Sequence, residues 1–393
     1  MKLGISLAAI TVTALVAAGC GSSSSSKSSA TSASSTQAAG GGSGSKSCTA
    51  SIGIEAPLTG QVAVLGQEQL AFAKLAIQDD NKANGTNITL VQGDTQLMPA
   101  QATTVTQQFI SNSKIVGVVG PAGSQEVEAV GPLFGRAGLV FISGSATNPT
   151  LTSSGKNPTF FRTVSRDDVQ GPEDANFVVK HLHPKNLMIV DDQEVYSTGL
   201  VSAMMPIFQK AGIKVDHESV SQKVTDFSSL VAKVSSDTTV VVLPWQVAAN
   251  GQQFGKNLAE QHKNATIVGT DGMFSPSAFT TPGSYVSSFG PDITAIPADA
   301  SIVQAAKTAY PKFGTFGPPV YAATHVLDEA IASACKSGTA TRSSVLSAVK
   351  QTSEPTSILG QPIHFDTRGD LIAAKWFLFK INPQGKYTLV TNS

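Results

Sequence analysis

GVVGPAGSQEVEAVGPLFGRAGLVFISGSATNP, residues 117–149, contains a complete change from strand to helix and back to strand. The run GVVG is short and apolar, which is typical of a buried strand. A Gly-Pro turn and a segment with helical periodicity follow, and then LVFISG begins a second buried strand. A strand, a helix and a strand in this order predict two parallel strands joined by a crossover helix.

The same alternation continues on both sides of this stretch. The runs ASIGIEAPL and ITLVQGD precede it, and NLMIVDD, KVDHES, TTVVVLP and ATIVGTD follow it, with helical segments between them. We therefore predict an α/β fold with two lobes, each a doubly wound parallel sheet. Residues 362–390 alternate with period two around turn residues, which predicts antiparallel edge strands.

The two lobe patterns change over near residues 163–166, 293–298 and 360–364, which predicts a hinge of three crossings. Lobe 1 is expected to comprise residues 48–164 and 296–361. Lobe 2 is expected to comprise residues 165–295 and 362–393.

The N-terminus predicts export. Residues 1–19 contain one cation, Lys2, and an apolar run too short to span a bilayer, as in a signal peptide. The end VAAGC resembles a bacterial lipobox, in which Cys20 is lipidated and anchors the protein to the outer side of the cell membrane. An ordinary secretory signal cleaved nearby is the alternative. Residues 20–47 are nearly all Ser, Gly and Ala, which predicts a disordered tether.

Composition limits the partners. Lys and Arg total 27 and balance 27 Asp and Glu, so the chain lacks the basic excess that nucleic-acid binding requires. In an oxidising compartment Cys48 and Cys335 form a disulfide or remain two separately buried thiols, since spacing alone does not fix connectivity.

Ligands of open α/β sheets bind outside the carboxyl ends of the strands. In lobe 1, Ser124 stands where a helix begins, and it is expected to cap that helix and to offer its hydroxyl to an anion. Capping alone is the alternative. Ser145 and Thr147 follow the next strand and are expected at the same edge.

The second lobe offers a carboxylate and aromatic side chains. Asp271 follows the strand ATIVGTD, where it can pair with a cation, although Asp-Gly is also a common turn pair. Tyr196 and Trp245 lie just beyond strands and are expected to cover a ligand, whereas Trp376 is expected in the core. Hydroxyls on one lobe and a carboxylate with aromatics on the other predict a free α-amino acid bound between the lobes.

Residues 51–381 resemble the branched-chain amino-acid-binding proteins of ABC transporters, the type I extracytoplasmic solute receptors. The resemblance rests on the ordered motifs IGIEAPLTGQVAVLGQEQLAFAKLAI, the opening stretch of 33 residues, FRTVSRDDVQGP, TDFSSLVAKV and FDTRGDL. It implies a type I periplasmic binding protein fold. It also implies a monomer whose lobes close on a small solute and deliver it to an ABC permease and its ATPase.

The resemblance also implies residue roles. Ser124, Ser145 and Thr147 match positions that hold the ligand carboxylate and ammonium, and Asp271 matches the acid that pairs with the ammonium. The aromatics Tyr196, Trp245 and Tyr321 would cover the side chain of the ligand. The family's chain path would also bring Cys335 to Cys48.

Two departures leave the ligand open. The acid is commonly Glu and here is Asp271, and Leu65 replaces an aromatic, so an amide or a small carboxylate is an alternative ligand. The motifs G-x-S-x-G and H-E-x-x-H are missing and the six histidines are scattered. We therefore predict no catalytic residue, no cofactor and no metal site. The alternative to transport is a subunit that reports the ligand to a membrane sensor.

Overall fold

The structure, a computed structural model, describes residues 48–392. The predicted signal peptide, the lipidation of Cys20 and the tether lie outside these residues. Among residues 48–392 there is no helix whose length and hydropathy would let it span a membrane.

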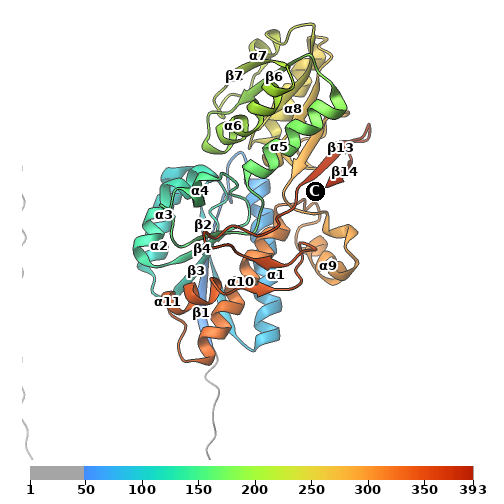
Figure 1. Cartoon of the computed structure of the whole chain (residues 1–393). Helices are drawn as coiled ribbons and strands as arrows, with labels where there is room; N and C mark the ends of the chain where they lie inside the picture. The colour runs from blue at the N-terminus through green and yellow to red at the C-terminus, as the bar shows by residue number, and fades with distance from the viewer. Residues whose placement is uncertain (1–47, 393) are drawn as a thin grey trace, which may run out of the picture. The chain divides into compact units, whose positions relative to one another are not determined.

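The first lobe contains a five-stranded parallel sheet in the order β2-β1-β3-β4-β5 (Figure 1). Its strands are β1 (Thr49–Ala56), β2 (Asn87–Asp94), β3 (Ile115–Val119), β4 (Val140–Ser143) and β5 (Phe160–Arg162). β3 and β4 are buried along their whole length, because helices cover both faces of the sheet. The first four strands were predicted, whereas β5 has three residues and too little sequence to show a period.

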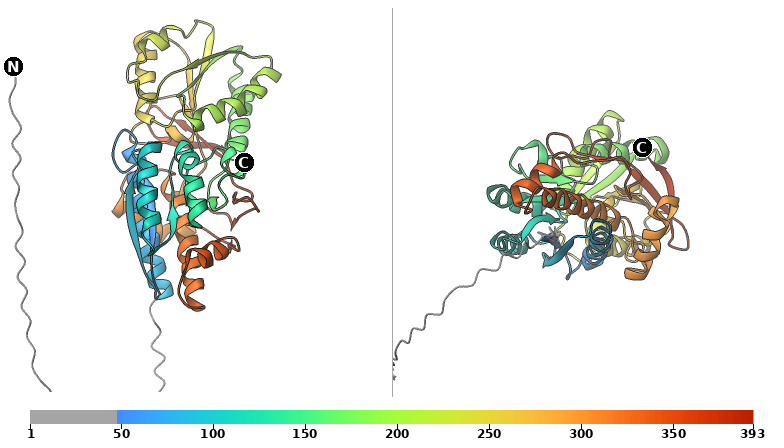
Figure 2. Two further views of the ribbon diagram at one scale, coloured as in Figure 1. Left: turned by 90° about the vertical axis from the view of Figure 1, so that its left-hand side faces the viewer. Right: turned by 90° about the horizontal axis from the view of Figure 1, so that it is seen from below.

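Helices of the first lobe come from two parts of the chain. The N-terminal part contributes α1 (Ala63–Asn84), α2 (Pro99–Ser111), α3 (Ser124–Ala137) and α4 (Thr150–Ser153). A later part contributes α9 (Ala300–Ala309), α10 (Gly317–Lys336) and α11 (Arg342–Val349), preceded by the short helices η3 (Ile293–Ala295) and η4 (Pro297–Asp299). Figure 2 shows this later part beside α1, and α10 packs directly against α1. The two parts therefore share one hydrophobic core.

The second lobe contains a seven-stranded sheet in the order β14-β13-β10-β9-β8-β6-β7. Its strands are β6 (Asn186–Asp191), β7 (Lys214–Ser219), β8 (Thr238–Leu243), β9 (Thr266–Gly269), β10 (Tyr285–Ser288), β13 (Phe377–Ile381) and β14 (Tyr387–Asn392). β13 pairs antiparallel with β10, and β14 pairs antiparallel with β13. The antiparallel strands predicted for the C-terminal tail are thus confirmed. The helices of this lobe are α5 (Asp167–Phe177), η1 (Val178–Leu182), α6 (Val195–Lys210), α7 (Ser228–Ala232), α8 (Ala248–Glu260) and η2 (Asp271–Met273).

The third crossing between the lobes lies later than predicted. Ile363, Phe365 and Leu371 belong to the core of the first lobe, and Phe365 packs against Phe161 with ring centroids 5.1 Å apart. Two strands of two residues each, β11 (Ser353–Glu354) and β12 (Ile363–His364), pair antiparallel in the same part of the chain. The chain therefore passes to the second sheet after Leu371. The period-two pattern that begins at residue 362 does not distinguish side chains packed under one lobe from strands of the other.

A disulfide joins Cys48, just before β1, to Cys335 near the end of α10, with Cα atoms 5.7 Å apart. The bond links residues 287 positions apart in sequence. It therefore ties the start of the globular unit to the segment that returns to it.

We expect Cys48→Ala with Cys335→Ala to lower the free energy of unfolding by about 2 to 4 kcal/mol, because the cross-link restricts the unfolded chain. Urea unfolding of the double variant and the parent measures this. Equal midpoints for the two proteins would show that the cross-link does not contribute to stability.

Candidate ligand-binding cleft

A small cavity lies where the carboxyl ends of strands from the two sheets meet. Its volume is about 20 Å³, room for roughly one water molecule. The lining residues come from both lobes and are Leu65, Leu97, Ala122, Ser145, Tyr196, Gln246, Asp271, Gly272 and Phe316.

The lobes contact each other around this cavity. The side-chain amide of Gln125 donates to Gln246 Oε1 over 2.9 Å, and the Gln246 amide donates back over 3.3 Å. The Asn148 amide donates to the Val195 carbonyl over 2.9 Å. An apolar cluster beside the cavity also combines residues of both lobes: Val62, Leu97, Ala122 and Val247. These contacts mean that the lobes are closed in this structure. The lobes must separate before a solute larger than water can enter the cavity.

Two hydroxyls of the first lobe lie at this edge of the sheet. Ser145 Oγ donates to the Ala122 carbonyl over 2.8 Å and accepts from Gln69 Nε2 over 2.9 Å. Ser124 Oγ accepts the backbone N–H of Asn148 over 3.2 Å. Both side chains are thereby oriented within the lobe.

The predicted helix cap at Ser124 is wrong. Ser124 is the first residue of α3, and the N-cap position belongs to Gly123. The Glu126 carboxylate accepts the Gly123 N–H over 2.8 Å, so this acid satisfies the start of the helix in place of a serine hydroxyl.

Thr147 lies next to an acid that the sequence did not single out. Its hydroxyl is buried beside the Asp167 carboxylate without a hydrogen bond of ordinary geometry. Burial raises the pKa of Asp167 well above its usual value, and the neighbouring Asp271 raises it further. Thr147 in the first lobe and Asp167 and Asp271 in the second therefore form one polar group.

Asp271 is the centre of a hydrogen-bond network. Its Oδ1 accepts from the Tyr196 hydroxyl over 2.7 Å and from Gln170 Nε2 over 2.6 Å. Tyr196 Oη lies 2.6 Å from Thr270 Oγ1 and accepts the Gly272 N–H over 3.0 Å. Burial raises the pKa of Asp271 to about 6, against the opposing effect of the Tyr196 and Gln170 hydrogen bonds. The network fixes the orientation of the carboxylate.

Arg162, at the end of β5, holds the loop that carries Thr147. Its side chain is fully buried, and its Nη1 donates to the carbonyls of Ala146 and Asn148 over 3.0 Å each. Its Nε donates to Asp370 Oδ1 over 2.8 Å. The motifs FRTVSRDD and FDTRGDL are therefore joined beneath the cleft by an ion pair.

Trp245 and Tyr321 are not brought to the cavity. The Trp245 indole donates to the Val190 carbonyl over 2.8 Å and packs in the second-lobe core, tilted against Phe227 and edge-to-face with Phe254. The Tyr321 hydroxyl donates to Asp79 Oδ2 over 2.9 Å at the contact of α10 with α1. A position just after a strand or at the start of a helix does not fix the direction of an aromatic side chain. Trp376 is buried, as predicted.

Sequence reasoning missed the glutamines and Phe316. Gln246 directly follows Trp245, and the sequence pattern favours the aromatic Trp245 as the residue that covers a ligand. Phe316 precedes α10 in a stretch without strand or helix periodicity. Asp167 stands in the quoted motif FRTVSRDD, where two adjacent acids after an arginine were a usable signal.

Some polar groups next to Asp271 lack hydrogen-bond partners. Within residues 48–392, hydrogen bonds are missing for the buried atoms Asp167 Oδ1 and Oδ2, Gln170 Oε1 and the Thr147 hydroxyl. A buried acceptor without a donor is unfavourable by about 1 to 3 kcal/mol. The groups around Asp271 therefore suit a solute that brings N–H donors and positive charge to them.

Known proteins resemble the chain along most of its length. An amino acid binding protein of Pseudomonas aeruginosa is 27% identical over 346 residues, which are 86% of this chain and 91% of that protein. The substrate-binding protein LivJ from Streptococcus pneumoniae, solved in complex with isoleucine, is 23% identical with a TM-score of 0.77 over 87% of this chain and 99% of that one. A solute-binding protein of an ABC transporter from Rhodopseudomonas palustris BisB5, solved with 3,4-dihydroxybenzoic acid, is 20% identical with a TM-score of 0.76, covering 88% of this chain and 97% of that one.

The solved structures share the two-lobed α/β fold predicted from the sequence. The profile of the periplasmic binding protein family matches residues 49–386, nearly the whole of the described chain. The chain belongs to the periplasmic binding protein family.

Proposed function

We propose that this protein is an extracytoplasmic receptor that binds a small amino acid, or a close relative, between its lobes and delivers it to an ABC permease. The observation that carries the proposal is the buried carboxylate of Asp271 in the interlobe cavity, across from Ser145 of the first lobe. A carboxylate in a desolvated site favours a cationic group, because unpaired buried charge is unfavourable.

The side of the cleft across from Asp271 suits an anion. Ser124 and Ser145 lie beside the N-terminus of α3, where backbone N–H groups carry partial positive charge. Leu65, Leu97 and Phe316 supply apolar contacts for a side chain. A free amino acid, with ammonium and carboxylate on one carbon, fits this polarity. The relative named for amino acid binding and the neighbour solved with isoleucine support this ligand class.

A ligand without an amine is the second candidate. Burial raises the pKa of Asp271 to about 6, so a protonated Asp271 could donate a hydrogen bond to an acid or a phenol in mildly acidic solution. The neighbour solved with 3,4-dihydroxybenzoic acid supports this candidate. Both candidates are binding rather than catalytic roles, in keeping with a family of solute-binding proteins.

Lobe closure is the expected mechanism, and it tests the receptor function. A ligand shifts the balance of open and closed forms only by its higher affinity for the closed form. A thermal-shift panel of amino acids, amides and small carboxylates first selects a ligand. Small-angle scattering should then show a smaller radius of gyration with saturating ligand than without. An unchanged radius with a ligand that stabilises the protein would contradict closure.

We also propose that Cys20 is lipidated and holds the receptor at the outer side of the cell membrane, on the basis of VAAGC alone. Mass spectrometry of the mature N-terminus should find a diacylated Cys20 as the first residue. An unmodified Cys20, or a mature chain that begins after it, would exclude the anchor.

A further inference from the structure

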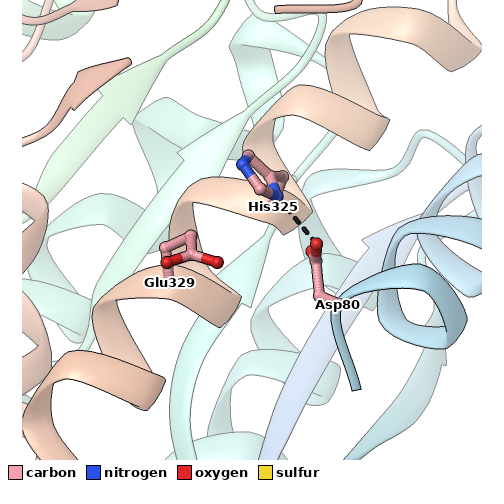
Figure 3. A group of neighbouring side chains, drawn as sticks. All are labelled: Asp80, His325 and Glu329. Atoms are coloured by element: carbon pink, nitrogen blue, oxygen red, sulfur yellow. Dashed lines mark hydrogen bonds and ion pairs between the residues drawn. The ribbon is translucent and has the colours of Figure 1, made fainter. Parts of the chain in front are cut away.

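The contact between α1 and α10 brings together three side chains of types that can bind a metal ion (Figure 3). None of them lines the interlobe cavity. Asp80 comes from α1, and His325 and Glu329 come from α10. His325 and Glu329 are four residues apart, so they project from one face of that helix. One ligand atom of each of the three residues lies within 4.8 Å of the others, and His325 Nδ1 is 2.8 Å from Asp80 Oδ1.

A third acid, Asp328, lies against this group, and within residues 48–392 neither of its carboxylate oxygens forms a hydrogen bond. The side chain of Asp328 is fully buried. Asp80 is 5% exposed, and its Oδ2 is also unpartnered. Asp328 follows His325 by three residues on α10, so the two side chains are neighbours on the same side of that helix. Three buried acceptor oxygens without a donor are unfavourable unless a cation or a proton joins them.

The surrounding charge is strongly negative. Besides Asp80 and Asp328, the acids Glu329 and Glu354 lie near His325. Over residues 48–392 no Lys or Arg forms an ion pair with Asp80, Asp328 or Glu329. Asn84 Nδ2 donates to Glu329 Oε1 over 2.7 Å, which orients Glu329 and leaves its second oxygen available.

We propose that Asp80, His325 and Glu329 bind a divalent transition-metal ion, for which Zn²⁺ is the best fit, and that the ion clamps α1 to α10. One imidazole nitrogen and two carboxylates are ligands that Zn²⁺ accepts, whereas Ca²⁺ and Mg²⁺ are bound in proteins mainly by oxygen. Three protein ligands leave a fourth position for water or for the adjacent Asp328. The sequence alone predicted no metal site, because Asp80 and His325 are 245 residues apart.

Calorimetric titration of ZnCl₂ into mature protein without a polyhistidine tag, cleared of metal with EDTA and dialysed, tests the site. We expect one Zn²⁺ per chain and a higher melting temperature when zinc is present. His325→Ala and Glu329→Gln should each weaken zinc binding at least tenfold. Glu329→Gln keeps the size of the side chain, so it remains informative if His325→Ala folds poorly.

His217→Ala is the matched control. His217 also pairs with an acid, Asp191, at 2.8 Å, but it does not belong to a group of three ligands. This variant should bind zinc as the parent does. Absence of saturable zinc binding, or equal binding by the parent, His325→Ala and Glu329→Gln, would overturn the proposal. No residue of the cluster lines the interlobe cavity, so the result does not depend on the proposed amino acid ligand.

Discussion

Arg162→Met is expected to lower the free energy of unfolding by about 3 to 5 kcal/mol, the usual result of removing one partner of a buried ion pair. The guanidinium of Arg162 is fully buried, and four of its hydrogen bonds disappear in the variant. Asp370 keeps two partners, because its Oδ2 lies 2.8 Å from Arg166 Nη1 and accepts from the Thr152 hydroxyl over 3.0 Å. The loss should therefore fall near the lower end of the range.

The same substitution should weaken ligand binding, because the Ala146 and Asn148 carbonyls that flank Thr147 lose their donor. Urea unfolding and calorimetry measure the two effects. Arg368→Met is the control, since Arg368 pairs with Asp366 at 3.2 Å but its side chain is 51% exposed. Surface pairs of this kind contribute about 0 to 1 kcal/mol. Equal stability of the two variants would refute the anchoring role of Arg162.

Asp271→Asn should weaken the binding of an amine-bearing ligand by about 2 to 5 kcal/mol at neutral pH, because the ammonium would be left in a closed cleft without its counter-charge. Calorimetric titration of the best ligand from the thermal-shift panel measures the loss. Asp216→Asn is the control: Asp216 is a half-buried acid of the same lobe, 3.9 Å from Lys214, and this variant should bind as the parent does.

The pH dependence of binding gives a second measure of Asp271. Burial raises the pKa of Asp271 to about 6, so its protonated form is favoured in the folded protein, and the stability from this shift is lost as the pH rises through 6. An ammonium ligand requires the ionised form. Its affinity should therefore fall below pH 6, approaching about tenfold per pH unit. Asp271→Asn should lack this dependence, and an equally steep dependence in the variant would assign the titration to another group.

The sequence predicted the fold well because two patterns, one for strands and one for helices, alternate along it. Buried parallel strands such as β3 and β8 are continuous apolar runs, and the crossover helices repeat apolar residues every three to four positions. Elements without enough residues to show a period, such as β5 and β11, were not predicted.

The candidate site was predictable where chain direction decides position. Tyr196 and Asp271 come together because the strand ends of the second sheet share one edge, and Ser145 reaches them because the corresponding edge of the first sheet faces it across the cavity. Trp245 was placed wrongly, because its indole turns back to a backbone carbonyl of the neighbouring strand and no local pattern signals that contact. The Gln125–Gln246 pair joins residues 121 positions apart, and only the closed lobes bring them together.

We propose that the cleft between the lobes holds the ammonium group of a small solute against Asp271. Calorimetric titration of ligand-free protein with pairs of compounds distinguishes this from other ligands: each amino acid of a panel, and the carboxylate that lacks only its α-amino group. At pH 7.5 we predict that at least one amino acid binds about 30-fold or more tightly than its partner, the equivalent of about 2 kcal/mol. Equal affinities within every pair, or binding only by the compounds without the amine, would contradict the account.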